Sequence, residues 1–573
     1  MSVDTGAPTS EELAAPEAPA GRPPRVFQPT FSGTGVVVGA LFFALSLLPS
    51  LLPRAGYVQG LVSGISFMVG YGVGATAQAV WDYLQIPKLK GRARTIVLGL
   101  LVALVVWAVI GGVWRQVGWQ NEIRTIFGMP SISFTIWPVI LVVALLTAAL
   151  ILAVSRSFRL LFRAVGRWLG TWMPRRLAIT LGTAALLLII WGLLTGVIVN
   201  GFFTGANFFF SGRDSATAEG IEQTDSELRS GGPASLVQWD ELGRQGRSFV
   251  ATGPTVAQLN TANGGSDAQE PVRVYVGLKS ADSLEERADL LLEELKRTGA
   301  FEREALVVAT TTGTGFLDPN GVDPVEYVFN GDTAIAGVQY SYLPSWISLL
   351  ADQEAVKETS RVVFRAVHGY WSSLPEDSRP KLYLYGLSLG SYGVESILGS
   401  IEIVNEPIDG AFMTGPPFVN QLHSELSQAR QEGTSPGTPI YQDGTTVRFT
   451  AEEDNLGKTP GPWGPTRLLY LQHGSDPVVF FSPDLAYSVP DWLLDGQRAP
   501  DVSELMGWFP LVTMWQVALD LPGAGNVPDG FGHLYSKRAN LEGWVAVTNP
   551  DGWTQAKTEA LVSVLEATPT ASD

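Results

Sequence analysis

The chain has 573 residues, a formal net charge of −17, no cysteine and four histidines with no close pair. This length predicts two or three domains, and the absence of cysteine excludes a disulfide framework and a thiolate metal site. Four separated histidines argue against a structural zinc site. Residues 1–200 carry 15 Lys and Arg against 6 Asp and Glu, whereas residues 201–573 carry 23 against 49. The acidic second part argues against nucleic acid as a partner, and we expect neither a metal nor a cofactor.

The first 204 residues have the composition of a membrane domain. Residues 1–30 are rich in Ala, Pro and Glu without periodicity, which predicts a disordered tail. Residues 31–204 then predict a transmembrane domain of five helices, because each of five uncharged stretches is long enough to cross a hydrocarbon core about 30 Å thick. These stretches are residues 26–53, 55–81, 95–113, 125–155 and 177–204. The first lacks the pattern of a cleavable signal peptide.

The basic residues predict the orientation in a plasma membrane. The loop at 82–94 carries Lys88, Lys90, Arg92 and Arg94, and the loop at 156–176 carries six arginines. Since basic loops stay in the cytoplasm, the N-terminus is predicted inside and everything after about residue 205 outside. The 156–176 loop is either an amphipathic helix on anionic headgroups or a plain cytoplasmic loop.

Small residues in the second stretch have a spacing that allows helices to approach closely. Gly60 and Gly64, and Gly70 and Gly74, each lie four residues apart. Such pairs serve packing within one chain or a homo-oligomer formed through the membrane helices, or they are ordinary glycines of a membrane helix. Membrane lipids are the expected surroundings, and residues 205–270 are interpreted as a connecting segment.

Strand and helix patterns alternate from residue 271 to the C-terminus. Strands are predicted at 272–278, 305–310, 334–342, 381–385, 410–413 and 467–472, and helices at 283–297, 353–371, 391–400 and 554–565. This alternation predicts a mostly parallel sheet covered by helices over residues 271–573.

The sequence Gly386-Leu387-Ser388-Leu389-Gly390 stands between one of these strands and a helix. Strand, G-x-S-x-G and helix in that order predict a nucleophile elbow of the α/β-hydrolase type, with Ser388 at the turn. A serine nucleophile needs a base and a carboxylate that orients the base, which follow it in the order acid and then histidine. Asp476 follows the strand at 467–472 and His533 comes later, so Ser388, Asp476 and His533 are the predicted catalytic residues.

Other residues compete for these roles. Asp484 and Asp529 are rival acids and His473 is a rival base, whereas His368 and His423 fall in helical stretches as ordinary positions. The oxyanion hole is predicted from the amide of Leu389 and from Thr312 and Gly313 in the loop after an earlier strand. That loop is not a phosphate-binding loop, because no lysine follows its second glycine.

A family resemblance rests on four segments. They are the elbow, Thr310-Thr311-Thr312-Gly313-Thr314-Gly315-Phe316, Tyr340-Ser341-Tyr342-Leu343-Pro344-Ser345-Trp346 and Leu48-Pro49-Ser50-Leu51-Leu52-Pro53-Arg54. Over residues 30–565 the chain resembles an actinobacterial family of membrane-anchored α/β-hydrolases, whose elbows often carry an acidic residue where this chain has Leu387. The resemblance implies an envelope serine hydrolase acting on lipids of the mycolic-acid type.

The expected architecture is thus an α-helical membrane domain followed by an α/β-hydrolase domain with a cap-like insertion at about 486–528. The aromatic stretch at 492–521 either covers a pocket for the lipid or acyl-ester substrate or packs on the sheet. The predicted function is an extracytoplasmic serine hydrolase of acyl esters. The alternatives are an acyltransferase using the same triad and a non-catalytic membrane scaffold or transporter component.

Overall fold

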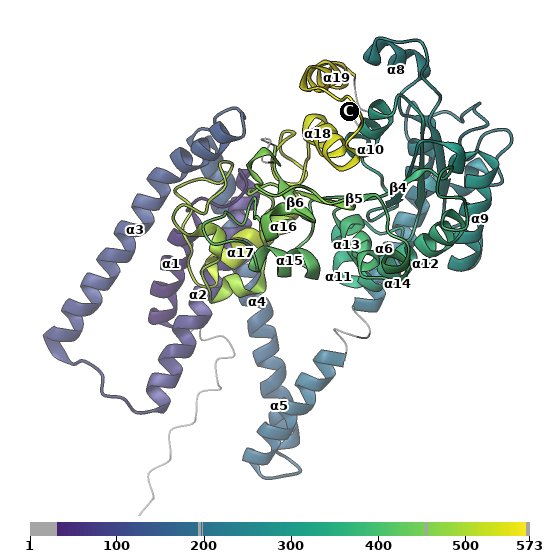
Figure 1. Ribbon diagram of the computed structural model, residues 1–573. Coiled ribbons are helices and arrows are strands. Elements are labelled where there is room, and N and C mark those ends of the chain that lie inside the picture. Colours follow the sequence, from purple (N-terminus) through teal and green to yellow (C-terminus); the bar gives the residue numbers. More distant parts are fainter. Residues whose placement is uncertain (1–30, 193–195, 197–198, 453–455, 569–573) are drawn as a thin grey trace, which may run out of the picture.

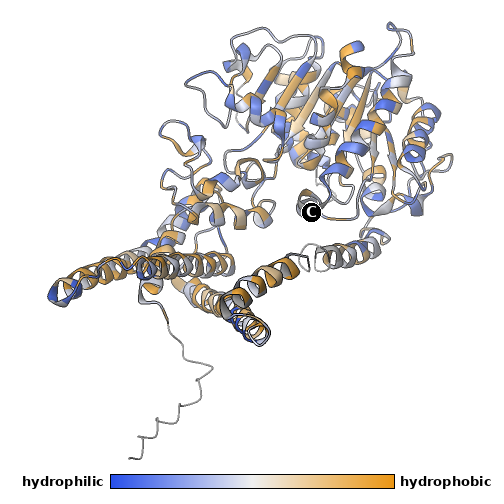
Figure 2. Ribbon diagram, turned by 90° about the horizontal axis from the view of Figure 1, so that it is seen from below, coloured by the Kyte–Doolittle hydropathy of each residue, from blue (hydrophilic) through white to orange (hydrophobic). Residues whose placement is uncertain are grey.

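The computed structural model describes residues 31–192, 196, 199–452 and 456–568, so the tail predicted at 1–30 lies outside the described residues. Long helices formed by residues 33–192, here called the helical region, stand beside a domain built on one β-sheet, residues 272–568, here called the sheet domain (Figure 1). Apolar residues cover the outside of the long helices but concentrate in the interior of the sheet domain (Figure 2).

Three helical stretches are long and apolar enough to cross a membrane: α2 (Gly56–Tyr83), α3 (Gly91–Ile126), and Phe134–Leu169, which joins η1 (Phe134–Ile136) to α4 (Trp137–Leu169). Of the other two predicted spans, the first contains the shorter helix α1 (Gly33–Ser46). The last contains α5 (Arg175–Gly192) and lies partly outside the described residues, at 193–195 and 197–198. The 14 residues of α1 rise about 21 Å, less than the roughly 30 Å of a bilayer core. The predicted number of five spanning helices is therefore corrected to three among the described residues.

The sequence predicted too many spanning helices, and residues 47–55 show one physical reason. This apolar stretch does not continue α1, because Pro49 and Pro53 interrupt it; Leu51 and Leu52 instead are buried in a protein core. Hydropathy alone does not distinguish residues buried in protein from residues that face lipid. Of the two interpretations of residues 156–176, the helical one holds for the first 14 positions, because α4 continues to Leu169.

The glycine pairs of α2 pack within the chain. A Cβ on Gly60 or Gly64 would lie 2.7 Å from atoms of Val143 or Ala144 in α4, too close to fit without movement. Gly70 and Gly74 are equally close to α1, at Phe42 and Thr34. The predicted close approach of helices is therefore present between α2 and its neighbours α1 and α4.

Between residues 199 and 271, four helical segments lead to the sheet domain. They are α6 (Val199–Asp214), η3 (Trp239–Glu241), α7 (Gly243–Ala251) and α8 (Val256–Asn263). The carboxylate of Asp214, at the end of α6, accepts hydrogen bonds from the Arg244 amide and from Gln339 Nε2. The end of α6 is thereby fixed to α7 and to the residue that follows a strand of the sheet.

In the part of the chain that the structure describes, the sheet has seven strands in the order β1-β3-β2-β4-β5-β7-β6, and every pair is parallel. The strands are β1 (Val272–Val276), β2 (Ala305–Thr310), β3 (Thr333–Val338), β4 (Lys381–Leu387), β5 (Gly410–Thr414), β6 (Val447–Thr450) and β7 (Arg467–Leu471). The predicted parallel sheet is confirmed. Because all strands share one direction, their carboxyl ends meet at one edge, where β4 ends in the elbow.

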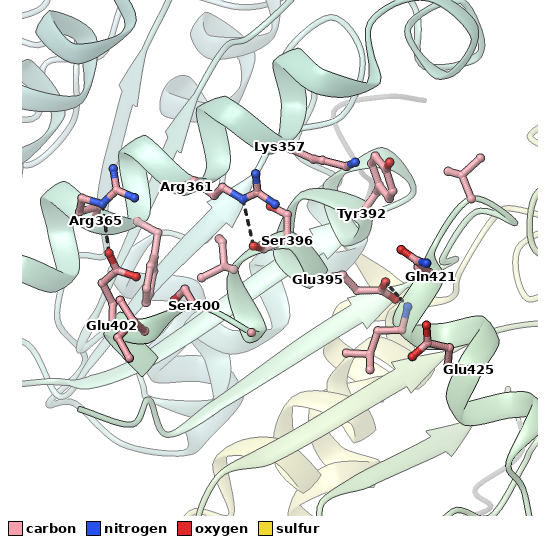
Figure 3. A pocket seen from close by; sticks show the side chains of 16 residues that line it. Lys357, Arg361, Arg365, Tyr392, Glu395, Ser396, Ser400, Glu402, Gln421 and Glu425 are labelled. Atoms are coloured by element: carbon pink, nitrogen blue, oxygen red, sulfur yellow. Dashed lines mark hydrogen bonds and ion pairs between the residues drawn. The ribbon is translucent and has the colours of Figure 1, made fainter. Parts of the chain in front are cut away.

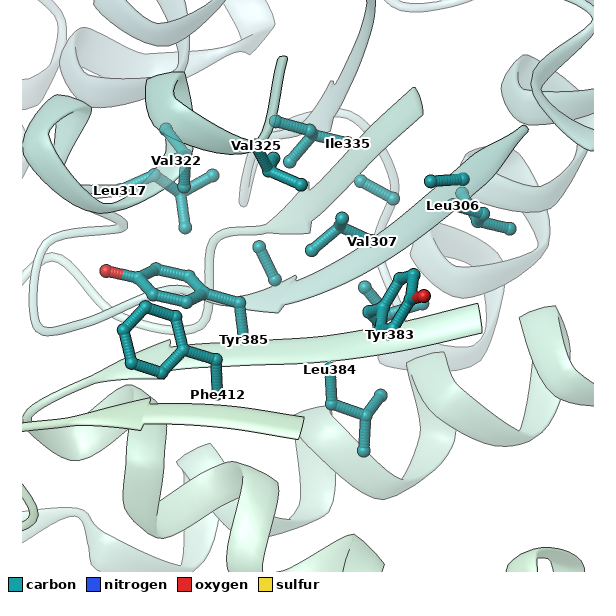
Figure 4. Packing of buried hydrophobic residues seen from close by; sticks show 14 of the residues in the cluster. Leu306, Val307, Leu317, Val322, Val325, Ile335, Tyr383, Leu384, Tyr385 and Phe412 are labelled. Atoms are coloured by element: carbon teal, nitrogen blue, oxygen red, sulfur yellow. The ribbon is translucent and has the colours of Figure 1, made fainter. Parts of the chain in front are cut away.

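Helices cover both faces of this sheet. One face is covered by α9 (Leu284–Arg297), α12 (Gln353–Trp371) and α13 (Leu389–Leu398). The other is covered by α10 (Pro319–Val328) and α18 (Lys537–Thr548), and α19 (Gln555–Ala567) packs on α18. Side chains alternate along β4, so that Tyr383 and Tyr385 point to one face and Leu384 to the other (Figure 4). The rings of Tyr385, Phe412 and Trp544 pack together with centroids 5.4 to 5.8 Å apart.

The segment at residues 477–528, here called the insertion, leaves the sheet after β7. Its short helices are α16 (Pro477–Phe480), η7 (Pro483–Ala486), η8 (Asp491–Leu493), α17 (Val512–Asp520) and η9 (Leu521–Gly523). The sequence left open whether the aromatic part covers a pocket or packs on the sheet. The structure shows that α17 packs on α1 and α2 of the helical region.

Candidate active site

Ser388 occupies the sharp turn between β4 and α13. Its backbone has φ 55° and ψ −124°, a strained conformation that holds the residue between strand and helix. A Cβ on Gly386 would lie 2.3 Å from the backbone of Gly390, and one on Gly390 would lie 2.4 Å from the Thr310 carbonyl oxygen. The two glycines of G-x-S-x-G are therefore required by close backbone approaches on both sides of the serine.

Asp476 and His533 lie in direct contact. Asp476 Oδ2 is 2.6 Å from His533 Nδ1, and its Oδ1 accepts a hydrogen bond from the amide of Val478 at 2.8 Å. The Asp476 side chain is fully buried and caps α16, in the loop that follows β7. The hydrogen bond from Nδ1–H orients the imidazole and favours the tautomer with an unprotonated Nε2.

His533 Nε2 is buried and has no hydrogen-bond partner among the described residues, and no bond links it to Ser388 Oγ. The ring nevertheless lies near the nucleophile. A Cβ on Gly415 would come within 2.7 Å of His533 Cε1, and the preceding residue, Thr414, accepts the Ser388 amide at 2.9 Å. The structure thus brings Asp476 and His533 together and places their pair beside the elbow.

Two further residues shape this arrangement and were not predicted. The hydroxyl of Tyr535 donates to Asp476 Oδ2 at 2.7 Å, which adds a second donor to the oxygen that contacts His533. Gly415 leaves the space that the imidazole ring occupies. The sequence carries no signal for either residue, because Tyr535 meets Asp476 and Gly415 meets His533 only through contacts between segments distant in the chain.

The rival residues have other partners. His473 Nδ1 faces the Gly532 carbonyl at 2.8 Å, and its Nε2 faces Glu452 Oε1 at 2.9 Å. Asp484 is exposed and accepts from the Tyr487 hydroxyl, and Asp529 is exposed as well. His368 Nε2 contacts the Glu406 carbonyl, and burial lowers the pKa of His423 to about 4. None of these hydrogen bonds involves Ser388.

His473 and Glu452 form an ion pair beneath the loop of His533. Burial alone would lower the pKa of His473, but the hydrogen bond and charge of Glu452, aided by Asp501 and the Gly532 carbonyl, raise it above 6.5. Burial would raise the pKa of Glu452, yet His473 and Ser536 lower it below 4.5. Since both ring nitrogens face acceptors, the doubly protonated imidazole satisfies the site.

This pair predicts a pH-dependent stability. The His473 contribution is complete below its unfolded-state pKa of about 6.5 and is lost as the pH rises through the higher folded-state value. The Glu452 contribution is lost only on acidification below about 4.5. At pH 6 we expect the wild type to have a higher free energy of unfolding than His473→Gln. This difference, measured by chemical denaturation, should become smaller as the pH rises to 9. A difference that does not change with pH would contradict the ion pair.

The predicted oxyanion donors divide into two groups. The Leu389 amide lies in the first turn of α13 and donates to no acceptor among the described residues. This is expected, because the first amides of a helix have no acceptor within the helix. The amide of Thr312 instead donates to the Phe316 carbonyl at 2.9 Å, and that of Gly313 to the Tyr340 hydroxyl at 2.8 Å. Leu389 is therefore available in this structure, whereas Thr312 and Gly313 are engaged.

The cavities near the sheet have different surroundings. One of about 330 Å³ lies between α6 and the Thr312 loop, with Phe210, Phe316 and Tyr342 in its lining. A larger groove of about 630 Å³ lies along α12 and α13 (Figure 3). Its charged groups largely neutralise one another, as Arg365 pairs with Glu402, and Ser388 does not line it. Within the described residues, no group of three or more acidic, His or Cys side chains could hold a metal ion.

The sheet order, the elbow and the acid–histidine pair after β7 together define an α/β-hydrolase. A model of an alpha/beta-hydrolase family matches residues 272–561, and a model of the N-terminus of an alpha/beta-hydrolase family matches residues 47–254. The chain therefore belongs to this α/β-hydrolase family. Searches of curated proteins and of solved structures returned no match. The two family matches cover most of the helical region and nearly all of the sheet domain.

Proposed function

We propose that this protein is a membrane-anchored serine hydrolase that cleaves acyl esters of lipids outside the cytoplasm. The observation that carries the proposal is the buried Asp476 carboxylate 2.6 Å from His533 Nδ1, with Nε2 left unpartnered beside the elbow of Ser388. Nε2 accepts the Ser388 hydroxyl proton as Oγ attacks the ester carbon, and Asp476 stabilises the resulting imidazolium. His533 returns the proton to the leaving alcohol, and water then hydrolyses the acyl-enzyme.

A lipid substrate is supported by the position of His533. Phe531, two residues earlier, stacks on Phe127, which directly follows the last helical residue of α3. His533, the predicted base, therefore lies close to the end of α3, one of the helices long and apolar enough to cross a membrane. A lipid ester at a membrane surface would meet the site there, whereas the acidic sheet domain disfavours anionic soluble substrates.

A series of p-nitrophenyl esters from two to sixteen carbons tests the substrate class. Each methylene buried in an acyl site contributes about 0.8 kcal/mol. We expect kcat/KM in detergent to rise with chain length, with the Ser388→Ala protein as the blank. A preference for acetyl over every longer chain would exclude the lipid proposal and leave a short-chain esterase.

The outside location is supported by the distribution of basic residues. The loop after α2, with Lys88 and Lys90, and the arginine-rich end of α4 lie at the end of the helices away from the sheet domain (Figure 1). The 47–55 and 127–133 connections instead contact the insertion. Basic loops in the cytoplasm would leave the sheet domain outside, provided that the chain returns to that side after α4 by way of α5, which packs on α4, and α6.

Introduced cysteines test this topology without interference, because the chain has none of its own. Glu376 is exposed on the sheet domain, and Leu89 is exposed in the loop after α2. In intact cells, we expect a membrane-impermeant maleimide to label the Glu376→Cys variant and to leave Leu89→Cys unlabelled until the cells are permeabilised. Labelling of Leu89→Cys alone in intact cells would reverse the assigned orientation.

A further inference from the structure

The loop that carries His533, residues 529–534, is contacted on one side by the sheet domain. The Gly532 amide donates to Ser475 Oγ at 3.0 Å, and its carbonyl faces His473 Nδ1 at 2.8 Å. These bonds fix the backbone immediately before His533 to residues that follow β7. They leave the opposite side of the loop to be held by other parts of the chain.

The helical region contacts that opposite side. The ring of Phe531 stacks on Phe127 with a centroid distance of 4.5 Å and an interplanar angle of 25°. Leu52 Cδ2 lies 3.3 Å from the position that a Cβ on Gly532 would take. Phe127 and Leu52 are both almost completely buried, so these contacts belong to a packed core shared by the helices and the insertion.

The backbone of His533 itself is tied to the same core through the insertion. Its amide donates to the Ala524 carbonyl at 2.9 Å, and Ala524 directly follows η9. Asp520, at the end of α17, accepts from Arg54 Nε at 2.7 Å and from Ser50 Oγ at 2.5 Å. The side chains of Arg54 and Asp520 are each 1% exposed, and displacement of either would leave a buried charge unpaired.

We infer that the helical region positions the base of the triad, with Phe127, Leu52 and Arg54 as positioning residues for His533. This inference rests on the proposed function, in which His533 Nε2 takes the proton of Ser388. Proton transfer requires the two atoms within hydrogen-bond reach, and a displacement of about 1 Å can lower a rate by about 100-fold. The helices therefore contribute to catalysis as well as to attachment at the membrane.

The test removes the aromatic stack in the full-length protein. Phe127→Ala and Phe531→Ala are each expected to lower kcat for p-nitrophenyl butyrate by about 10- to 100-fold with little change in KM. The double variant should fall no further, because both substitutions remove the same contact, and Phe127→Leu should restore part of the rate. Trp137→Ala is the matched control, since Trp137 is buried in a separate cluster of the helical region.

Hydrogen exchange provides a readout that does not depend on turnover. In Phe127→Ala, peptides covering 524–534 should exchange faster, while the elbow peptide around Ser388 should keep its wild-type rate. Wild-type kcat in Phe127→Ala, or an equal loss of kcat in Trp137→Ala, would overturn the inference even if a fluorophosphonate labels Ser388. A wild-type protein that is neither labelled nor active on esters would overturn the proposed function, and the catalytic part of this inference with it.

Discussion

Replacing Ser388 by alanine is expected to abolish covalent labelling by a fluorophosphonate and to lower ester kcat/KM by about 10⁶-fold. The substitution removes only the hydroxyl group. Alanine fits the strained turn as well as serine does, because the close contacts of the elbow arise at Gly386 and Gly390. The folded state should therefore be preserved. The measurements are gel-based labelling of the purified protein and initial rates on p-nitrophenyl esters.

A neighbouring serine provides the control for this substitution. Ser391 stands in the first turn of α13, fully buried, with its hydroxyl donating to the Ser388 carbonyl at 2.6 Å. Ser391→Ala should retain labelling at Ser388, because its hydroxyl is engaged in the helix. Undiminished labelling and activity in Ser388→Ala would place the nucleophile elsewhere and remove the proposed mechanism.

Replacing His533 by alanine is expected to lower kcat/KM by about 10⁴- to 10⁶-fold, and combining it with Ser388→Ala should cause little further loss. Without the imidazole no group at the elbow accepts the serine proton. Asp476→Asn should be severe as well, by about 10⁴-fold, since an amide donor there favours the wrong tautomer. Single-turnover labelling and steady-state rates measure both effects.

The histidine that competes for the role of base gives the contrasting result. His473 is engaged at both ring nitrogens, so His473→Gln should reduce stability but preserve at least a tenth of the wild-type labelling rate at neutral pH. If His473→Gln eliminates labelling while His533→Ala does not, the base has been assigned to the wrong residue.

Local patterns predicted the features that local geometry determines. The elbow was recognisable because close backbone approaches require glycine two residues before and two residues after Ser388. The parallel sheet was recognisable because strands and helices alternate in the sequence. Asp476 and His533 were predicted from their order and from the strand before Asp476. The sequence did not indicate Gly415 or Glu452, whose roles arise only when segments distant in the chain come together.

The helical region shows the same limit. Residues 47–55 read as part of a membrane span because they are apolar, although they are buried against an insertion more than 400 positions later. Likewise, the glycine-containing loop after β2 predicted free amides at Thr312 and Gly313. Those amides are not free, because they donate to the Phe316 carbonyl and the Tyr340 hydroxyl. The spacing of residues in the sequence does not predict these two contacts.

The bond between Ser50 and Asp520 joins residues 470 positions apart and has a consequence for the order of folding. Contacts of such separation form late, since the chain between them must already be synthesised and arranged. The elbow and the sheet around β4 depend on much nearer partners. A nascent chain would therefore form the elbow of Ser388 well before the loop of His533 is fixed, so that the proposed triad would be complete only in a finished molecule whose helices are already packed.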